Sequence, residues 1–126
     1  MIKQSNNQFK ILPLHSIAHA RAGDKGNVSN ISLITYKPNA YDFIVKKITE
    51  KKVLKLFSKL GATKVNRYLL PNLNAINFVI ENTLDGGVNS SKSVDRHGKT
   101  LSFFLLSEIK LKIPLKFIPS NSPYLF

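Results

Sequence analysis

The side chains best suited to binding chemistry gather in one short stretch, residues 20–30, which reads Ala-Arg-Ala-Gly-Asp-Lys-Gly-Asn-Val-Ser-Asn. Arg21 and Lys25 lie on either side of Asp24, and two glycines lie three positions apart among them. Glycine allows positive φ and close approach of the backbone, while Arg and Lys bind anions through charge-assisted hydrogen bonds. The stretch predicts a tight polar turn between two strands that cradles an anion with backbone N–H groups and two cations. A structural loop closed by an ion pair from Asp24 to either cation is the alternative, and these residues alone leave both open.

A second charged cluster, Asp-Arg-His-Gly-Lys-Thr at residues 95–100, again combines a carboxylate, cations and a glycine. A glycine and a lysine just before a helix suit an anion at the helix N-terminus, and a solvated loop capped by Thr100 is the alternative. We expect the two clusters to lie side by side at one end of the sheet, because Asp24 and Asp95 then each neutralise a cation of the opposite cluster. The candidate ligand-binding residues, with two asparagines further along the chain, are Arg21, Gly23, Asp24, Lys25, Gly26, Asn27, Asn30, Asn72, Asn77, Asp95, Gly98 and Lys99.

Other site chemistries lack support in the spacing or the composition. The chain has no cysteine, so it offers no disulfide, no thiolate metal site and no Cys nucleophile. His15 and His19 share one face of a predicted strand, but no third ligand has matching spacing, and no metal site is expected. The glycines match neither the phosphate-binding P-loop nor the dinucleotide fingerprint, and no nucleophile-elbow motif occurs. No residue can be named as catalytic, and the sequence leaves open whether the protein is an enzyme.

Composition limits the class of protein and its partners. The chain has 126 residues, 43% of them hydrophobic, which fits one domain with an ordinary core. Its formal charge is +12, from 19 Lys and Arg against 7 Asp and Glu, so phosphorylated ligands, nucleic acid and acidic proteins are compatible partners. Only three of these cations are Arg, and the abundance of Lys, Asn and Ile suggests a compositional bias of the source genome.

Two partner classes are therefore not expected. Nucleic-acid binding should be weak, salt-dependent and independent of sequence, because the predicted strands show no aromatic pair for stacking on RNA. No apolar run approaches the length of a membrane span, and the polar N-terminus lacks the apolar core of a signal peptide. A cytoplasmic location is expected.

Hydrophobic spacing predicts the elements that hold these residues. Residues 11–18 predict a first strand, irregular at Pro13, and residues 29–36 a second strand. A short helix is expected at 41–48. Thr49 then caps a second helix, which buries Val53, Leu54, Phe57 and Leu60 and ends at Gly61. Residues 64–70 predict a third strand, stopped by Pro71.

The second half of the chain predicts two more helical segments. A helix is expected from residue 72, with Leu73, Ile76, Ile80 and Leu84 on one face. A polar loop over 88–98 follows, and residues 101–111 predict a helix passing into an extended piece. The proline-containing end cannot form a helix and is expected to lie across the body or a partner. The chain thus divides into a polar tail 1–10, a domain 11–113 and a Pro-rich tail 114–126.

The order of these motifs resembles a known family. Residues 20–27, with Asn30 and Ile31, resemble the "ARSGDKGN…NIG" signature of the small C-terminal domain of the acyclic-terpene-utilisation (AtuA) family, which also occurs as a free-standing protein. Residues 67–78 resemble its "rYelPNl.AlNFvl" motif, and residues 95–101 its "D.qGKtL" motif. Ala22 departs from the pattern, which usually has Ser there. The resemblance covers roughly residues 14–113 and implies an α/β (α+β) fold, a ferredoxin-like two-layer sandwich with a mainly antiparallel sheet and helices packed on one face.

The resemblance also implies a metabolic setting. Larger members carry this domain behind a big N-terminal domain and are associated with catabolism of branched acyl-CoA compounds from acyclic terpenes. The chain is therefore expected to be an accessory or catalytic subunit that partners a larger AtuA-type chain, binds an anion at the two charged clusters and has no bound cofactor, with a CoA thioester as a conceivable substrate. A non-enzymatic assembly domain, including a homo-oligomer, is the alternative, and a nonspecific nucleic-acid binder is a second one.

Overall fold

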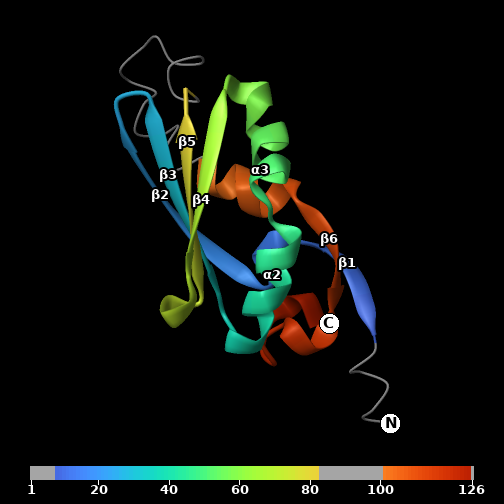
Figure 1. Ribbon diagram of the computed structural model, residues 1–126. Helices are drawn as coiled ribbons and strands as arrows, with labels where there is room; N and C mark the ends of the chain where they lie inside the picture. Colours follow the sequence, from blue (N-terminus) through green and yellow to red (C-terminus); the bar gives the residue numbers. More distant parts are fainter. Residues whose placement is uncertain (1–7, 83–100, 126) are drawn as a thin grey trace.

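The computed structural model describes residues 8–82 and 101–125 of the chain, apart from the side chain of Asp24 (Figure 1). The sequence prediction of a polar loop over 88–98 lies outside the described residues. So do the candidate site residues Asp95, Gly98 and Lys99 and the predicted meeting of the two charged clusters.

A four-stranded antiparallel sheet forms the centre of the molecule. Its strands are β2 (Ala18–Lys25), β3 (Val28–Thr35), β4 (Lys64–Leu70) and β5 (Ala75–Glu81), in the order β2-β3-β5-β4. Helices α2 (Tyr41–Lys47) and α3 (Glu50–Phe57) connect the two hairpins, and residues 101–108 form a further helix after them. All three helices cover the same face of the sheet (Figure 1). The predicted ferredoxin-like α+β sandwich with helices on one face is thus confirmed.

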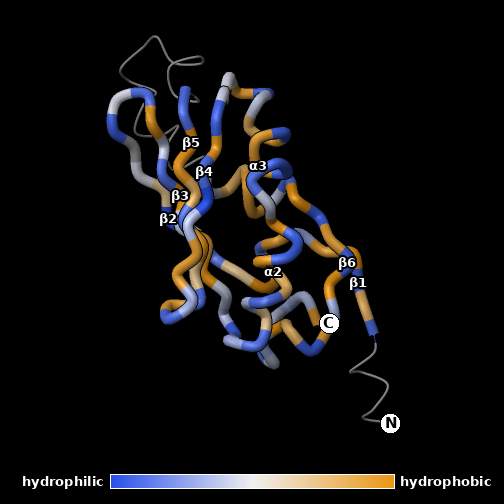
Figure 2. Tube along the Cα trace, in the orientation of Figure 1, coloured by the Kyte–Doolittle hydropathy of each residue, from blue (hydrophilic) through white to orange (hydrophobic). Residues whose placement is uncertain are grey.

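The core lies between this sheet and the helices. Alternate residues of the two central strands are fully buried, namely Ile31 and Leu33 on β3 and Ile76, Phe78 and Ile80 on β5. They meet buried residues from every helix, namely Ile44, Val53, Phe57, Leu101 and Leu105. Because side chains alternate along a strand, the residues between them point to the face that none of the three described helices covers, which we call the open face. Figure 2 shows hydrophobic residues recurring along the sheet and α3, whereas the tip of the β2–β3 hairpin is hydrophilic.

The predicted helix signals in the first half are confirmed. The Thr49 side chain accepts a hydrogen bond from the Lys52 backbone N at 3.1 Å, which satisfies one of the free N–H groups at the start of α3. Gly61 has φ 99° after the short 3₁₀ turn that ends this segment, a conformation that favours glycine. Strand β4 has the predicted bounds, 64–70, and is stopped by Pro71.

The predicted first strand is in fact two strands in different sheets. Residues Phe9–Pro13 form β1, which pairs with β6 (Lys110–Pro114) in a separate two-stranded ribbon. A 3₁₀ turn at Leu14–Ser16 then redirects the chain into β2, and the Ser16 hydroxyl donates to the Pro13 carbonyl at 2.8 Å. Proline has no N–H for a continuous ladder, and the buried side chain of Leu14 fills the core at the bend.

The predicted helix from residue 72 is wrong. Residues Pro71–Leu73 form one 3₁₀ turn, Asn74 adopts a left-handed conformation with φ 52°, and the chain continues as β5. Ile76 and Ile80 satisfy helical spacing, but with Phe78 they also satisfy the two-residue period of a strand. The segment forms a strand because it lies between β3 and β4 and pairs with both of them.

The C-terminal end packs on the body. The predicted helix followed by an extended piece is confirmed by the helix at 101–108 and by β6. Residues 115–125 contain two short 3₁₀ turns and no α-helix. Ile118 is 2% exposed, and the Phe117 ring lies 5.2 Å from that of Phe43 on α2. The tail therefore lies across the domain.

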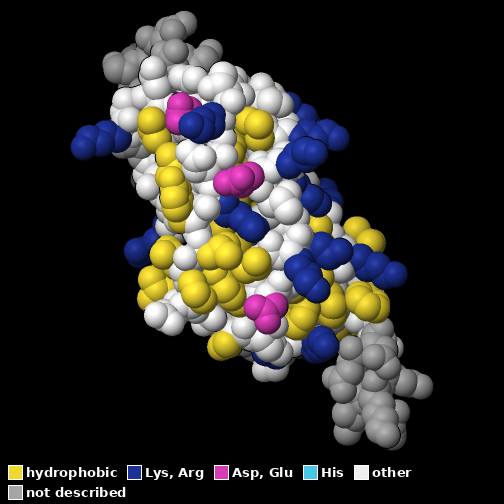
Figure 3. Space-filling view, in the orientation of Figure 1, with side chains coloured by type: hydrophobic (Ala, Val, Ile, Leu, Met, Phe, Trp, Pro, Cys, Tyr) yellow, Lys and Arg dark blue, Asp and Glu magenta, His cyan; other side chains and the backbone are white. Residues whose placement is uncertain are grey.

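Two further properties are the distribution of charged side chains on the surface and the length of the described helices. Lysine and arginine side chains are spread over the face shown in Figure 3 instead of forming one block. None of the helices in the described residues has the length and apolarity needed to cross a bilayer.

Candidate anion-binding face

The stretch predicted as a loop, residues 20–30, is mostly a β-hairpin. Strand β2 runs to Lys25 and β3 begins at Val28, so that only Gly26 and Asn27 form the turn. Gly26 has φ 64°, and a positive φ at the first of two turn positions is what a type II′ hairpin turn requires. The tight turn therefore needs one glycine, and the remaining charged residues belong to extended strands.

This geometry places the two cations of the stretch on one face of the sheet. Arg21, Gly23 and Lys25 alternate along β2 and share the open face. Asp24 occupies a register position opposite Ser29, and its side chain lies outside what the structure describes. The ion pair between Asp24 and either cation therefore stays a prediction.

A row of four polar residues crosses the open face. In the strand register Arg21 is opposite Ser32, Ser32 is opposite Asn77, and Asn77 is opposite Tyr68. With strands roughly 4.8 Å apart, the row spans about 14 Å. It presents a guanidinium, a hydroxyl, an amide and a phenol in one line.

Hydrogen bonds fix the centre of this row. The Asn77 amide Nδ2 donates to Asn30 Oδ1 at 2.6 Å and to Ser32 Oγ at 2.9 Å. These bonds join β5 to β3 above the ladder and hold the two β3 side chains in place. The polar floor of the open face is therefore preorganised.

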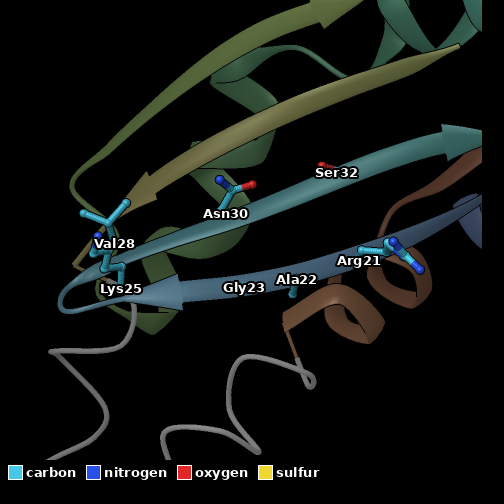
Figure 4. A pocket seen from close by; sticks show the side chains of 7 residues that line it. All are labelled: Arg21, Ala22, Gly23, Lys25, Val28, Asn30 and Ser32. Carbon is cyan, nitrogen blue, oxygen red and sulfur yellow. The ribbon is translucent and has the colours of Figure 1, made fainter. Parts of the chain in front are cut away.

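A hollow of about 670 Å³ lies over the hairpin part of this face (Figure 4). Arg21 lies towards one end and Lys25 towards the other, and Asn30 and Ser32 rise from the neighbouring strand. A Cβ built at Gly23 would meet none of the described residues within 4 Å, so they do not require glycine there for packing, and its lack of a side chain leaves the space open. The described residues that line it are Arg21, Ala22, Gly23, Lys25, Val28, Asn30 and Ser32.

The hollow has a positive character. Arg21 and Lys25 are exposed, and neither has a hydrogen-bond or ion-pair partner within the described part of the chain. The described side chains of the lining include no carboxylate. Two cations above neutral hydrogen-bonding groups can receive a phosphate or carboxylate, with Arg able to bind in a bidentate manner.

The structure brings together five of the candidate residues, namely Arg21, Gly23, Lys25, Asn30 and Asn77, with Gly26 and Asn27 at the adjoining turn. It does not bring Asn72 to them. Asn72 lies in the 3₁₀ turn before β5, at the end of the sheet opposite to the hairpin turn.

Sequence reasoning missed Ser32 and Tyr68. Tyr68 is 53% exposed and completes the polar row on β4. The signal for Ser32 was present, because a two-residue Gly-Asn turn fixes the hairpin register and sets Ser32 opposite Arg21. The signal for Tyr68 was hidden, because it required β5 to be recognised as a strand.

The described residues show neither a metal site nor a site centred on His19 apart from the open face. Among residues 8–82 and 101–125, no group of three or more His, Cys, Asp or Glu side chains could hold a metal ion. His19 alternates with Arg21 on β2, and its ring stacks on Tyr36 with centroids 5.2 Å apart.

The fold and this face define a class of protein: a ferredoxin-like α+β domain with a polar, cationic open sheet face. The family model described as the AtuA ferredoxin-like domain matches residues 12–110. The chain belongs to this family, as the motif resemblance implied. Comparisons with curated proteins and with solved structures gave no match.

Proposed function

We propose that this chain is a subunit that binds an anionic ligand on its open face and works with a larger AtuA-type chain in branched acyl-CoA metabolism. One observation carries the ligand part: Arg21 and Lys25, without partners among the described residues, flank the space above Gly23 over a hydrogen-bonded polar floor. The partner and the metabolic setting rest on membership of the family and on the resemblance of the motifs.

The spacing of the cations favours an extended ligand. Arg21 and Lys25 are four residues apart on one strand, which separates their Cα atoms by roughly 13 Å. A ligand with several anionic groups, such as the phosphorylated end of a CoA thioester, suits this spacing better than a single small ion does. The hollow has a volume in the range of small-molecule sites, which is about 300–1,000 Å³.

A titration with CoA, followed by calorimetry, tests the ligand part. Arg21→Gln and Lys25→Gln should each weaken binding about tenfold, the equivalent of one charge-assisted hydrogen bond of ~1.4 kcal/mol. Lys51→Gln removes an exposed lysine from α3 and should change the affinity less than twofold, within about 0.4 kcal/mol. Equal losses in all three variants would show attraction by net charge alone and contradict a site.

The assembly alternative has its own observation. Tyr68, Leu69, Leu70 and Leu73 are 53%, 46%, 38% and 66% exposed at the end of β4 and the following turn. Figure 3 shows apolar side chains gathered over the lower part of β4. A cluster of exposed apolar side chains marks interaction surfaces. The same cluster is a docking surface under either hypothesis, so it does not decide between them.

Co-purification with a larger AtuA-type chain separates the two functions. A stoichiometric complex in which Arg21→Gln lowers activity, with binding of the partner unchanged, supports the ligand-binding subunit. A complex whose activity is insensitive to Arg21→Gln and Lys25→Gln but is abolished by Leu73→Asp supports the assembly domain. No complex, with CoA binding retained, contradicts only the partner part.

A further inference from the structure

A second hollow, of about 440 Å³, lies where the C-terminal tail folds over the beginning of the domain. Its lining includes His15, Tyr36 and Lys37 from the first part of the chain and Asn121 and Tyr124 from the tail. None of its described lining residues also lines the hollow above Gly23. Its tail residues also lie beyond residue 110, where the match to the family model ends.

Contacts between rings give this hollow rigid walls. The Tyr124 ring meets His15 edge-on with centroids 5.9 Å apart, and its hydroxyl is 3.2 Å from His15 Nδ1. Tyr36 is held from a different side, because its ring stacks on His19. Pro119 and Pro123 add further apolar lining. Walls that are already ordered lose little entropy when a ligand binds.

Hydrogen bonds fix the tail segment that closes the hollow. The Ser122 backbone N donates to the Pro119 carbonyl at 3.0 Å, and Ser122 Oγ accepts from the Tyr124 backbone N at 3.1 Å. Lys10 Nζ donates to the Tyr124 carbonyl at 3.2 Å and ties the tail to β1. The tail therefore presents its side chains from a defined backbone.

The polar groups of this hollow are donors that suit a negative charge. Lys37 Nζ donates one hydrogen bond to the Lys116 carbonyl, at 2.9 Å, and an ammonium group has two further N–H groups. The Tyr36 hydroxyl and the Asn121 amide have no partner within the described part of the chain. Burial raises the pKa of Tyr36, with a further contribution from Tyr124, so its phenol is a hydrogen-bond donor at neutral pH. Among the residues that the structure describes, none that lines this hollow has a carboxylate side chain.

We propose that this hollow binds a small planar organic anion, an aromatic or conjugated carboxylate, whose ring packs among the tyrosine and proline side chains and whose carboxylate is bound by Lys37 and the Tyr36 hydroxyl. Charge complementarity favours a negatively charged ligand, because the Lys37 ammonium lines the hollow and the whole chain carries +12. The ring and proline walls select a ligand with an apolar body over inorganic phosphate.

Benzoate, followed by NMR of the ¹⁵N-labelled full chain, is the direct probe. Amide shifts should concentrate at Tyr36, Lys37 and residues 121–124. Lys37→Gln and Tyr36→Leu should each weaken benzoate binding about tenfold, and the uncharged benzamide should bind about tenfold more weakly than benzoate. Tyr36→Phe keeps the ring and removes the hydroxyl, and it should weaken binding about threefold.

Matched controls come from exposed residues that are not among the described lining of this hollow. Lys46→Gln on α2 and Tyr68→Leu on β4 remove the same side-chain types from exposed positions and should leave benzoate affinity unchanged. Shifts spread over surface lysines, equal affinity for benzamide, or no shift at all would overturn the proposal. Benzoate should not compete with CoA, so the failure of this site and the failure of the open-face site are separate results.

Discussion

Arg67 links strand β4 to the segment of helices α2 and α3 through hydrogen bonds. Its Nη1 donates to the carbonyls of Val45 and Ile48 at 2.7 and 3.0 Å, and its backbone N donates to Glu50 Oε2 at 2.7 Å. The last carbonyls of a helix have no partner within the helix, so the half-buried guanidinium caps α2. A single residue of β4 thereby contacts both helices before it.

Arg67→Met should lower the free energy of unfolding by about 2 kcal/mol, because it leaves two carbonyl groups without their charged donor. Urea denaturation measures this change. Arg21→Gln is the matched control, since Arg21 has no partner in the described residues, and it should stay within about 0.5 kcal/mol. Equal effects of the two substitutions would show that the cap contributes nothing.

Tyr36 makes stability depend on pH in the alkaline range. Burial, followed by the charge of Tyr124, raises its pKa above the ordinary value of 10.0. A group whose pKa is raised on folding contributes stability that is fully present below the unfolded pKa and is lost as pH rises through the folded pKa. The wild type should therefore lose more stability than Tyr36→Phe when the pH is raised from below 10 to above it. Denaturation curves at several pH values measure the difference, with Tyr68→Phe as a control for removal of an exposed phenol.

At the scale of elements, the two glycines of the β2–β3 hairpin differ in whether another residue can replace them. Gly26 has a positive φ that favours glycine, whereas the backbone of Gly23 does not have a positive φ. Gly26 has φ 64°, which costs an L-residue roughly 1–2 kcal/mol. Gly26→Ala should lower the free energy of unfolding by about that amount. Gly23→Ala should stay within about 0.5 kcal/mol of the wild type, because a Cβ there meets no described residue within 4 Å.

The same pair of variants separates stability from ligand binding. The methyl group of Gly23→Ala enters the hollow, so CoA affinity should fall while the denaturation midpoint is unchanged. Gly26→Ala should show the reverse pattern at temperatures where it remains folded. If Gly23→Ala leaves CoA affinity intact, the ligand does not occupy the space above β2.

Elements with local signals were predictable from the sequence. Thr49 and Gly61 mark the beginning and end of one helical segment through their own backbone chemistry, and Pro71 stops β4 where expected. The segment after Asn72 was predicted wrongly, because its apolar residues fit both periods and its pairing with β3 and β4 decides between them. Such pairing is a long-range property that local spacing does not contain.

The site was predictable in its chemistry and less so in its geometry. Arg21, Lys25 and Asn30 were recognised as binding groups from their types. Their shared face depends on a turn of only two residues, which carries both strands through the charged stretch. The hydrogen bonds from Asn77 to Asn30 and Ser32 exist only because Asn77 lies on a strand. The predicted helix would have separated it from both.

For the whole molecule, the tail completes the core. Ile113 and Ile118 are 0% and 2% exposed, and burial of each side chain is worth about 1.5–3 kcal/mol. Deletion of residues 111–126 removes both side chains and the partner strand of β1. Because small domains have only about 5–15 kcal/mol of net stability, the shortened chain should be largely unfolded by circular dichroism.

A shorter deletion is the matched control. Removal of residues 119–126 keeps β6, Ile113 and Ile118 and takes away Asn121 and Tyr124. This variant should remain folded and lose the benzoate site. A folded chain after deletion of 111–126 would show that the tail is an accessory to the core and not a part of it.

The pairing of β1 with β6 has a consequence for the order of events during synthesis. The two strands are far apart in the chain, because Ile11 of β1 pairs with Lys112 of β6. At roughly 5–20 residues per second, β1 leaves the ribosome about 5–20 seconds before its partner. During this interval Ile11 and Leu12 belong to an unpaired strand edge, which is a template for wrong pairing. The hairpins and helices that lie between β1 and β6 in the chain can form first. Strand β1, which is synthesised first, can pair only after β6 has been synthesised near the end of the chain.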